Sequence, residues 1–389
     1  MNILHFVPVY APAWSYGGPV RSISMLAEEQ ARQGHKVTVL TTNAGMTAAD
    51  GIIPDKWTVR NGVEVCYCGQ EEGFGIKSSS LEKSVKDRVG EFDVMHLSAI
   101  WHPVARAAHQ AARQKGVPVI VSPRGALGPY AWQRRRWLKK IYYALFEREH
   151  LKAAAGFHFT SKSEALESAK YIFGQPSCVV PNGIEESLWR RNELAGLNWR
   201  LAQGFAKSDL LLLYAGRLHH KKGLAILPAA LAKVQPAFPN QRLRFLLVGP
   251  NEDGTLQQLE NAMVQVGLPG CLHRMPTLPE VALPVIYSAA DIFLMPSLHE
   301  NFGNSAIEAL ACGCVSLVSA ETGCFEFGDG CGMKSVATHD SEQWADAIAG
   351  IFQSGRTVVT SNERTELFKR VGLDATAAEM IRFYQTFQT

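Results

Sequence analysis

The stretch PSLHENFGNSAIEALACG, residues 296–313, decides the fold of the second half of the chain. It follows the apolar run 292–295, which is typical of a strand, and it leads through a polar loop into an apolar helix that we expect to stop at Gly313. The loop holds one acid, Glu300, and the helix holds another, Glu308. A strand, a loop and a helix in this order indicate one repeat of a parallel sheet with covering helices.

The acid inside the helix has two interpretations. A helix start presents unpaired N–H groups and a positive dipole end, so residues 302–304 could donate to a phosphate. Glu308 would then face a diol such as a ribose, and Glu300 a second polyol such as a sugar ring. The alternative is a capping box, in which Ser305 is the N-cap and Glu308 returns to its backbone N–H. That alternative leaves Glu300 and the turn at Gly303 without a reason.

The rest of the chain repeats the same pattern in both halves. Short apolar runs without alternation, typical of strands covered on both faces, are separated by amphipathic stretches of helix length. The predicted strands are 3–7, 36–40, 63–66, 93–97, 118–121, 156–160, 210–215, 244–248, 292–295 and 315–318. The order predicts an α/β fold of two doubly wound, Rossmann-like domains that face each other across a cleft, with ligands at the carboxyl ends of the strands.

The two halves meet at a turn followed by a polar stretch. Pro181-Asn182-Gly183 has the composition of a turn, and the 389 residues of the chain suffice for two cores of ordinary size. We therefore expect an N-terminal domain over residues 1–185 and a C-terminal domain over residues 186–365. A helical segment, residues 366–389, is expected to pack back toward the N-terminal domain.

Composition excludes several classes of protein. Hydrophobic residues make up 47% and charged residues 19%, as in globular proteins. The net charge of +3 is too small to indicate a nucleic-acid partner, and no apolar run is long enough to span a bilayer. The start of the chain, MNILHFVPVY, is typical of a strand and lacks a basic leader, which favours a cytoplasmic location. The eight cysteines form no C-x-x-C pair, so we expect buried, reduced thiols and no zinc site.

A second loop with ligand chemistry follows the predicted strand 210–215. Its sequence is GRLHHKKG, residues 216–223, and its glycines let a ligand approach the backbone closely. Arg217 offers a planar fork for phosphate oxygens and Lys222 a point charge. The pair suits a diphosphate, and the alternative is a solvated basic loop.

Four segments together resemble the retaining GT-B glycosyltransferases of family 4. HENFGNSAIEALACG (299–313) is similar to the E-x7-E motif of that family, and GRLHHKKG to its G-R-x4-K-G loop. VVPNGIEESLW (179–189) is similar to its interdomain segment, and YAPAWSYGGPVRSISMLAEEQARQGHKVTVLTT (10–42) to its N-terminal Gly-Gly loop and first helix. The segments follow the family's order over residues 1 to about 320.

The resemblance implies a role for each matching position. Arg217 and Lys222 would neutralise a donor diphosphate, Glu300 would bind the hydroxyls of the transferred sugar, and Glu308 would hold the ribose. The other implied donor-binding positions are Gly17, Gly18, Asn301, Phe302, Gly303 and Asn304. No metal ion is implied, because protein cations and helix dipoles carry the charge of the leaving group, and the sequence has no D-x-D pair of carboxylates.

Further residues are assigned with alternatives. The family often has a histidine after the fourth strand. Here His96 is expected to end the strand, so His102, in a Trp-His-Pro loop, is the preferred catalytic residue. The alternative is that His102 is a packed or surface histidine without a catalytic role. Arg124, in SPRGALGPYAW, stands where many relatives have the histidine of P-H-G-M-L, and we assign it with Tyr16 to the acceptor. The segment LHRMPTLP lacks a glycine common near the base pocket of relatives, so the base is not identified.

Residues 132–152 are basic, with aromatic and aliphatic residues between the charges. One interpretation is a helix that lies with its apolar face down on an anionic membrane surface. The other is an ordinary helix with a solvated basic face and a core-facing apolar stripe. The resemblance supports the first, because the family often uses lipid-linked acceptors, and it would place the chain at the inner face of a membrane.

These features predict a retaining, metal-independent glycosyltransferase. It would move a hexose-type sugar from a UDP- or GDP-sugar co-substrate, without another cofactor, to a glycan or lipid-linked glycan in bacterial polysaccharide biosynthesis. The alternatives are a GT-B-fold nucleotide-sugar epimerase and a catalytically silent partner that binds sugar nucleotides. A Rossmann dehydrogenase is disfavoured, because no G-x-G-x-x-G follows the strand 3–7.

Overall fold

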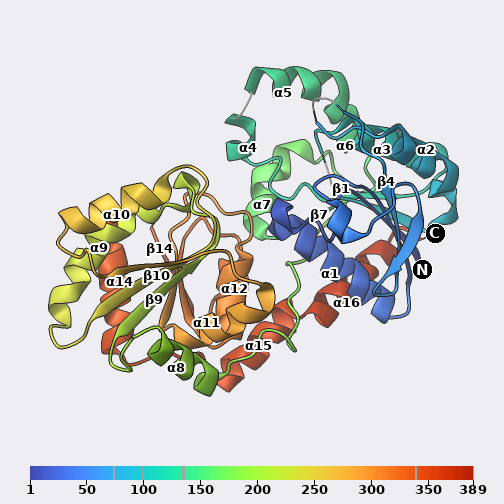
Figure 1. Ribbon diagram of the computed structural model, residues 1–389. Coiled ribbons are helices and arrows are strands. Elements are labelled where there is room, and N and C mark those ends of the chain that lie inside the picture. Colours follow the sequence, from blue (N-terminus) through green and yellow to red (C-terminus); the bar gives the residue numbers. More distant parts are fainter. Residues whose placement is uncertain (73–74, 99, 134–135, 338–339, 389) are drawn as a thin grey trace. The chain divides into compact units, whose positions relative to one another are not determined.

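The computed structural model describes residues 1–72, 75–98, 100–133, 136–337 and 340–388. The chain divides into two compact units, each with its own sheet and covering helices (Figure 1). Unit 1 consists of Met1–Gly183 and Leu373–Thr389, and unit 2 of Ile184–Gly372. The predicted α/β fold with two Rossmann-like domains is confirmed.

Unit 1 contains an eight-stranded sheet in the order β3-β4-β2-β1-β5-β6-β7-β8. Neighbouring strands are parallel except at the β3–β4 edge, which is antiparallel. The strands are β1 (Asn2–Val9), β2 (Lys36–Thr42), β3 (Trp57–Arg60), β4 (Val63–Cys68), β5 (Val94–Leu97), β6 (Val119–Val121), β7 (Gly156–Phe159) and β8 (Ser177–Val179).

Helices cover both faces of the unit 1 sheet. In β1, Ile3 and Val7 join one apolar core while Leu4 and Phe6 join another, as the two-residue period of a strand requires. The core of Ile3 and Val7 is closed by α1 (Gly18–Arg32) and α16 (Leu373–Gln385), which lie side by side (Figure 1). The other helices of the unit are α2 (Ser79–Arg88), α3 (Pro103–Gln114), α4 (Pro129–Gln133), α5 (Arg136–Tyr142), the π-helical turn η4 (Tyr143–Glu147), α6 (Arg148–Ala153) and α7 (Lys162–Ser168).

Unit 2 contains a six-stranded parallel sheet in the order β11-β10-β9-β12-β13-β14. The central strand β9 is buried along its whole length, which explains its uninterrupted apolar sequence LLLLYA. The strands are β9 (Leu210–Ala215), β10 (Leu243–Val248), β11 (Leu272–Met275), β12 (Ile292–Met295), β13 (Val315–Ser319) and β14 (Met333–Val336). The helices are α8 (Glu193–Ala202), α9 (Leu227–Val234), α10 (Thr255–Gln265), α11 (Leu283–Ala289), α12 (Asn304–Ala311), α13 (Phe325–Gly328), α14 (Ser341–Gln353) and α15 (Ser361–Val371).

Short 3-10 helices occur in both units. They are η1 (Trp14–Tyr16), η2 (Ala48–Asp50), η3 (Val89–Glu91), η5 (Ala169–Tyr171), η6 (His220–Lys222), η7 (Leu224–Ile226), η8 (Gln235–Ala237) and η9 (Glu280–Ala282). All eight cysteines are free thiols, and all but Cys178 are buried. Within the described parts of the chain, no helix combines the length and apolar composition that crossing a membrane requires.

The end of the second unit differs from the prediction. The expected boundary between residues 365 and 366 falls inside α15, whose Leu367, Phe368 and Val371 are buried in the core of unit 2. Residues 366–372 therefore belong to unit 2, and the chain returns to unit 1 only at Leu373.

Candidate active site

The strand order places the candidate loops of unit 2 at a topological switch point. From the central strand β9 the chain first adds β10 and β11 on one side and then β12 to β14 on the other. Loops that leave β9 and β12 at their carboxyl ends therefore run in different directions, and such points are the usual ligand sites of parallel sheets. The loop 216–223 follows β9, and the loop 296–303 follows β12.

The β9 loop is fixed to the loop that follows β10. The buried hydroxyl of Tyr214 donates to the carbonyl oxygen of Arg217 at 2.9 Å, and the backbone N–H of Leu218 donates to the carbonyl of Pro250 at 2.7 Å. At Gly249 an added Cβ would lie 2.1 Å from the carbonyl oxygen of Gly216. The two glycines therefore let the two loops approach more closely than side chains would permit.

The same loop is also fixed to the loop that follows β12. The backbone N–H of Leu298 donates to the carbonyl of Lys221 at 2.9 Å. Gly223 has φ 64°, and an added Cβ would lie 1.8 Å from the carbonyl oxygen of Pro296. The resemblance motif ends in this glycine because any side chain would separate the two loops.

A third loop, residues 322–324 after β13, holds the turn into α12. The backbone N–H of Cys324 donates to the carbonyl of Phe302 at 2.7 Å, and that of Gly323 to the carbonyl of Glu300 at 3.1 Å. Gly303, the N-cap of α12, has φ 100°, and an added Cβ would lie 2.9 Å from Thr322. The side chain of Phe302 is buried, so a ligand in front of this turn would meet its backbone.

The charged residues of the two loops pair with carboxylates. Lys222 forms an ion pair with Glu300, and both side chains are about one-fifth exposed, at 21% and 19%. Arg217 reaches Glu252, in the β10 loop, at 3.4 Å, and it is 64% exposed. Burial, and then the negative charge of Glu300, raise the pKa of Tyr214 well above its usual range. The structure thus brings Lys222 and Glu300 into contact, whereas Arg217 faces a different acid.

Glu308 lies inside α12 and is almost fully buried, with 5% exposure. Its carboxylate accepts a hydrogen bond of 3.0 Å from the hydroxyl of Tyr287 in α11. The capping-box alternative is wrong, because α12 begins at Asn304 after the N-cap Gly303, and the helix has no side-chain cap. With Ser305 inside the first turn, Glu308 is too far along the helix to reach an N-cap N–H.

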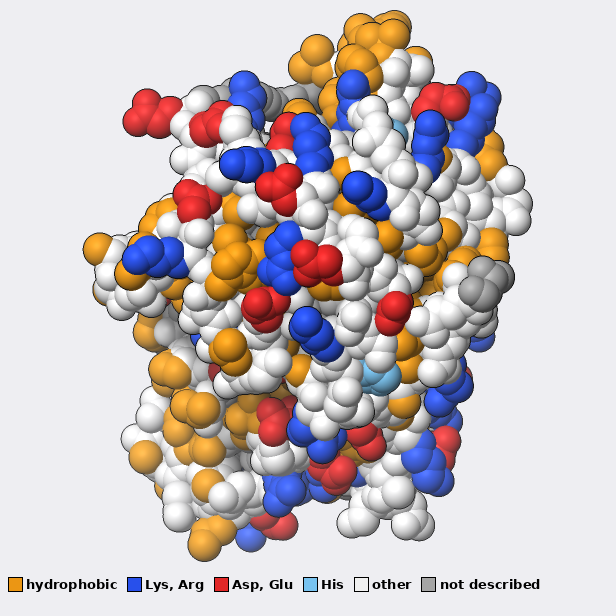
Figure 2. Space-filling view, turned by 90° about the vertical axis from the view of Figure 1, so that its right-hand side faces the viewer, with side chains coloured by type: hydrophobic (Ala, Val, Ile, Leu, Met, Phe, Trp, Pro, Cys, Tyr) orange, Lys and Arg blue, Asp and Glu red, His pale blue; other side chains and the backbone are white. Residues whose placement is uncertain are grey.

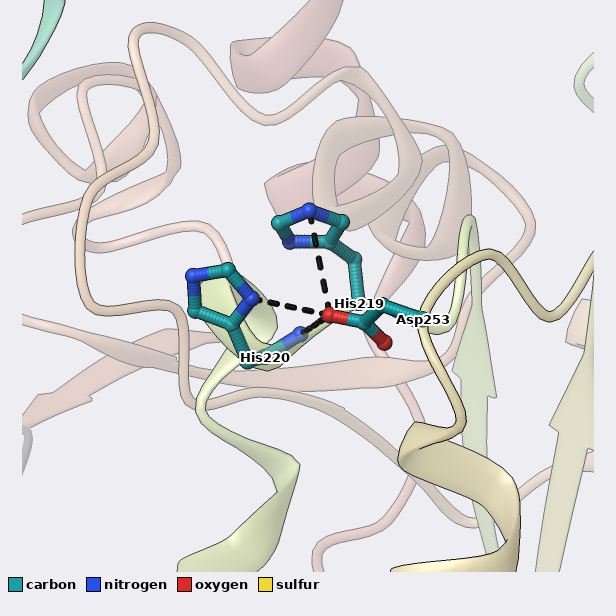
Figure 3. Close-up of side chains that lie close together, drawn as sticks. All are labelled: His219, His220 and Asp253. Carbon is teal, nitrogen blue, oxygen red and sulfur yellow. Dashed lines mark hydrogen bonds and ion pairs between the residues drawn. The ribbon is translucent and has the colours of Figure 1, made fainter. Parts of the chain in front are cut away.

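Two histidines and an aspartate cluster on the β9 and β10 loops (Figure 3). Both imidazoles approach one oxygen of Asp253, which lies 2.8 Å from Nδ1 of His220 and 3.8 Å from Nε2 of His219. That oxygen also accepts the backbone N–H of His220 at 2.8 Å, and this bond is the largest cause of the lowered pKa of Asp253. The carboxylate thus holds in place, through its hydrogen bonds, the turn η6 that carries Lys222.

The hydrogen bonds of this cluster differ from those of a metal site. Nδ1 of His219 accepts the backbone N–H of Lys221 at 3.2 Å, so the proton of the neutral ring lies on Nε2. A metal ion at Nε2 would need the lone pair that this tautomer lacks. We therefore interpret His219, His220 and Asp253 as the cap of η6.

In unit 1, Tyr16 and Gly17 lie between β1 and α1, after the carboxyl end of β1, and Gly18 is the first residue of α1. Gly17 has φ 83° and is the N-cap of α1, and Tyr16 is 52% exposed. His102 lies after β5, which pairs with β1, so both loops leave the sheet at its own switch point. His102 is the half-buried N-cap of α3, and burial lowers its pKa.

His96, the other histidine candidate, lies in the interior of unit 1. Its Nδ1 is 2.7 Å from the hydroxyl of Tyr384, and its Nε2 is 3.3 Å from Nδ1 of His158. Nε2 of His158 donates to the carbonyl of Val180 at 2.9 Å, so His96 donates to His158 and accepts from Tyr384. Desolvation lowers the pKa of His158 to about 3, and both rings are neutral.

Arg124 is held inside unit 1 by two other residues. Its guanidinium donates to Asn182 at 2.8 Å and to Ser22 at 3.0 Å, and desolvation lowers its pKa to about 10. These residues line one small pocket, together with His158 and Thr376. Arg124 therefore connects α1 to the turn at Asn182. Its role in binding the acceptor stays a prediction from the sequence.

The sequence did not point to several residues of the site. Glu252 and Asp253, in the segment NEDG, follow the strand 243–248, so the strand-end rule that selected Arg217 could have found them. Tyr287 had no such signal, because its contact with Glu308 depends on how α11 packs against α12.

Comparison with known proteins assigns both units to one family. The profile described as "Glycosyl transferases group 1" matches residues 209–354, and the profile described as "Glycosyl transferase 4-like domain" matches residues 17–183. A D-inositol 3-phosphate glycosyltransferase of Saccharomonospora viridis is 33% identical over 90% of this chain and 84% of its own length. A GDP-mannose:cellobiosyl-diphosphopolyprenol alpha-mannosyltransferase of Xanthomonas oryzae is 25% identical over 82% of this chain and 78% of its own length.

Other relatives align over shorter segments. For D-inositol 3-phosphate glycosyltransferases of Corynebacterium urealyticum and Nocardia farcinica, the chain spans 51% and 42% of the relative's length. Among solved structures, Anabaena Alr3699/HepE in complex with UDP has a TM-score of 0.77 at 16% identity and covers 99% of this chain and 100% of its own. The fold is therefore GT-B, and the chain belongs to the group 1 glycosyltransferases, family 4.

Proposed function

We propose that the chain is a retaining glycosyltransferase that takes a hexose-type sugar from a nucleotide diphosphate sugar. The observation that carries this proposal is the contact between Lys222 and Glu300 at the switch point of unit 2. A cation for phosphate and an acid for hydroxyls lie in contact there, in front of the glycine-capped start of α12. Relatives of the chain are glycosyltransferases by name, which supports the same reaction class.

UDP- and GDP-sugars are the donors that we propose. Anabaena HepE has been crystallised with UDP and with UDP-glucose, and the Xanthomonas relative is named for GDP-mannose. In the proposed complex the diphosphate attracts Lys222 and Arg217, and Lys222 exchanges part of its pairing with Glu300 for the phosphate. Glu300 then accepts hydrogen bonds from the sugar hydroxyls, and Glu308, positioned by Tyr287, accepts those of the ribose.

The proposed reaction proceeds by displacement on one face of the anomeric carbon. A donor phosphate oxygen assists removal of the acceptor proton, and Arg217, Lys222 and the start of α12 stabilise the negative charge of the leaving diphosphate. No metal ion is needed in this scheme, because protein cations supply the charge. His102 is the proposed catalytic histidine of unit 1.

The acceptor is proposed to be a glycan or a lipid-linked glycan of a polysaccharide pathway. Tyr16 and Arg124 are the proposed acceptor contacts, and Gly17 and Gly18 are proposed to let the backbone of unit 1 approach a ligand. A lipid-linked acceptor would be reached most directly by a cytoplasmic protein bound at the periphery of a membrane.

A thermal-shift screen with UDP, GDP and ADP, and with their glucose and mannose derivatives, tests the donor assignment. A nucleotide at 100 times its Kd should stabilise the chain by about 2.7 kcal/mol. If no nucleotide in this set raises the melting temperature, the donor assignment is wrong.

The Lys222→Ala variant tests the diphosphate role. We expect it to fold and to lose about 10²–10³ in turnover, the usual cost of one preorganised electrostatic group at a leaving group. Lys233→Ala is the matched control, because Lys233 pairs with Glu342 at the surface of the same unit. Wild-type turnover of Lys222→Ala would contradict the proposal, and an epimer formed from the donor alone would indicate an epimerase instead.

A further inference from the structure

The helical run 136–153, formed by α5, η4 and α6, carries large apolar side chains on its outer surface. Trp137 is 76% exposed, Leu138 65%, Ile141 56% and Leu145 64%. Trp137, Ile141 and Leu145 follow one another at intervals of four residues, so they form one stripe along the helix. We call these four residues the outer stripe.

The outer stripe is distinct from the side of this region that packs inward. Trp132 and Tyr143 contact the core of unit 1, and Trp132 stacks on Tyr171 with ring centroids 5.4 Å apart. The expectation of a core-facing apolar stripe is therefore right for Trp132 and wrong for the outer stripe. Arg134 and Arg135, which belong to the predicted membrane stretch 132–152, lie outside the described residues.

Exposed single apolar residues are normal, but a contiguous group of this size indicates an interaction surface. Figure 2 shows hydrophobic side chains projecting at the top of the molecule, where Figure 1 places α5, with lysine and arginine side chains close by. A globular protein gains nothing from holding indole and aliphatic groups in water. The chemistry of the surroundings indicates which partner would cover them.

The charges next to the outer stripe are mostly positive. Arg136 directly precedes Trp137 in the sequence and Lys140 directly precedes Ile141. The ammonium group of Lys140 lies 5.3 Å from the centre of the Trp137 ring. Glu147 is buried, and burial raises its pKa to about 7. The exposed Glu149 lies 3.3 Å from Lys152 and 4.0 Å from Arg148. Apolar side chains flanked by basic ones match the interface of an anionic bilayer, where tails and phosphate headgroups meet.

We propose that the outer stripe of residues 137–145 docks unit 1 on an anionic lipid bilayer. Trp137, Leu138, Ile141 and Leu145 enter the interface, while Arg136, Lys140 and Arg148 contact lipid phosphates. The helices concerned are too short to span the bilayer, so the contact is peripheral. The inference does not depend on the proposed reaction, because lipid binding is measured without a sugar donor.

Co-sedimentation with vesicles tests the proposal. The full chain should bind vesicles of phosphatidylcholine with 30% phosphatidylglycerol at least tenfold more tightly than vesicles of phosphatidylcholine alone. Replacing the stripe in one variant, Trp137→Ser with Ile141→Ser and Leu145→Ser, should weaken binding to anionic vesicles at least tenfold. Leu166→Ser is the matched control, because Leu166 is 77% exposed on α7 of the same unit.

A second variant separates the charges from the apolar groups. Arg136→Gln with Lys140→Gln should weaken binding to anionic vesicles and leave the weak binding to phosphatidylcholine unchanged. Circular dichroism confirms that each variant is folded, and transfer to a soluble acceptor, measured separately, reports on the proposed function. Equal sedimentation of the wild type and the stripe variant would overturn the proposal. So would a wild-type dimer in light scattering that the stripe variant dissociates, because a second copy would then be the occupant.

Discussion

Gly223 shows how one missing side chain sets the geometry of the candidate site. At its φ of 64° a side chain is strained, and an added Cβ would collide with the carbonyl of Pro296. The Gly223→Ala variant should therefore lose about 1–2 kcal/mol through backbone strain, and more through separation of the β9 and β12 loops. Urea unfolding and nucleotide titration measure the two effects.

Gly254→Ala provides the comparison for this variant. Gly254 has a similar φ of 78°, but an added Cβ would meet nothing within 4 Å. Its replacement should cost only the strain and leave nucleotide affinity unchanged. Equal effects of the two variants on nucleotide affinity would show that the close approach of the loops does not matter.

Tyr287 positions the buried carboxylate of Glu308 through its hydroxyl. Tyr287→Phe leaves this carboxylate without one of its donors, a change that costs about 1–3 kcal/mol in buried sites. We expect about a tenfold loss of affinity for UDP or GDP, whichever binds. If Tyr287 acts through Glu308 on the ribose, the variant and the wild type should bind the 2′,3′-dideoxy form of that nucleotide equally. A similar loss of affinity for the ordinary and the dideoxy nucleotide would show that Glu308 does not contact the ribose hydroxyls.

The sequence predicted some of the charged residues at the site but not how they pair. The motifs selected Lys222 and Glu300 separately, one for phosphate and one for sugar. Their contact arises because β9 and β12 are neighbours in the sheet, and strand order is not encoded in local spacing. For the same reason Glu308 was identified, whereas its partner Tyr287 was not.

At the scale of elements, Asp253 connects the loop after β10 with the turn η6. Replacing it by alanine removes the acceptor of the His220 N–H and of its ring. We expect Asp253→Ala to raise the Kd for the nucleotide about tenfold, because the turn that carries Lys222 is no longer fixed. Isothermal titration measures the affinity.

Asp340→Ala is the control for this prediction. Asp340 caps α14 of the same unit and accepts from the N–H groups of Glu342 and Gln343. Losing that cap should cost about 0.5–2 kcal/mol of stability without changing nucleotide affinity. If both variants lose affinity alike, the effect of Asp253 is only general destabilisation.

The strands that the sequence predicted correctly are those buried on both faces. Every predicted strand occurs at its place, from β1 to β13, whereas β3, β8, β11 and β14 were missed. The missed strands are short and lie at or near the edges of the sheets, and β3 and β11 have mostly exposed or half-exposed residues. Edge strands carry polar residues that prevent pairing with another chain along their open edge, so their sequences lack a continuous apolar pattern.

At the scale of the whole molecule, buried neutral histidines make the stability of unit 1 depend on pH. Desolvation lowers the pKa of His5 to about 4 and of His158 to about 3, and it lowers that of His96 as well. Below pH 6.5 the unfolded chain binds protons that the folded unit excludes, so the free energy of unfolding falls as the pH falls. Each group contributes at most about 1.4 kcal/mol per pH unit.

Urea unfolding at pH 7.5, 6.5 and 5.5 measures this dependence. His5→Asn keeps a donor for Gln30 but does not titrate. Between pH 6.5 and 5.5, unfolding of this variant should therefore take up about one proton fewer than unfolding of the wild type, and its free energy of unfolding should change less steeply with pH. An unchanged slope in His5→Asn would mean that this ring is protonated in the folded chain.

The return of α16 to unit 1 has a consequence for synthesis. Ala377, Met380, Ile381 and Tyr384 of α16 complete a core whose other buried members precede residue 181. All of unit 2 lies between these two groups in the chain. A ribosome makes unit 2 at about 5–20 residues per second. During the roughly ten to forty seconds that this takes, one face of the first sheet is not yet covered by α16. Unit 2, which is contiguous, is the first part that can finish folding, and the nascent first unit is the part that a chaperone would shield.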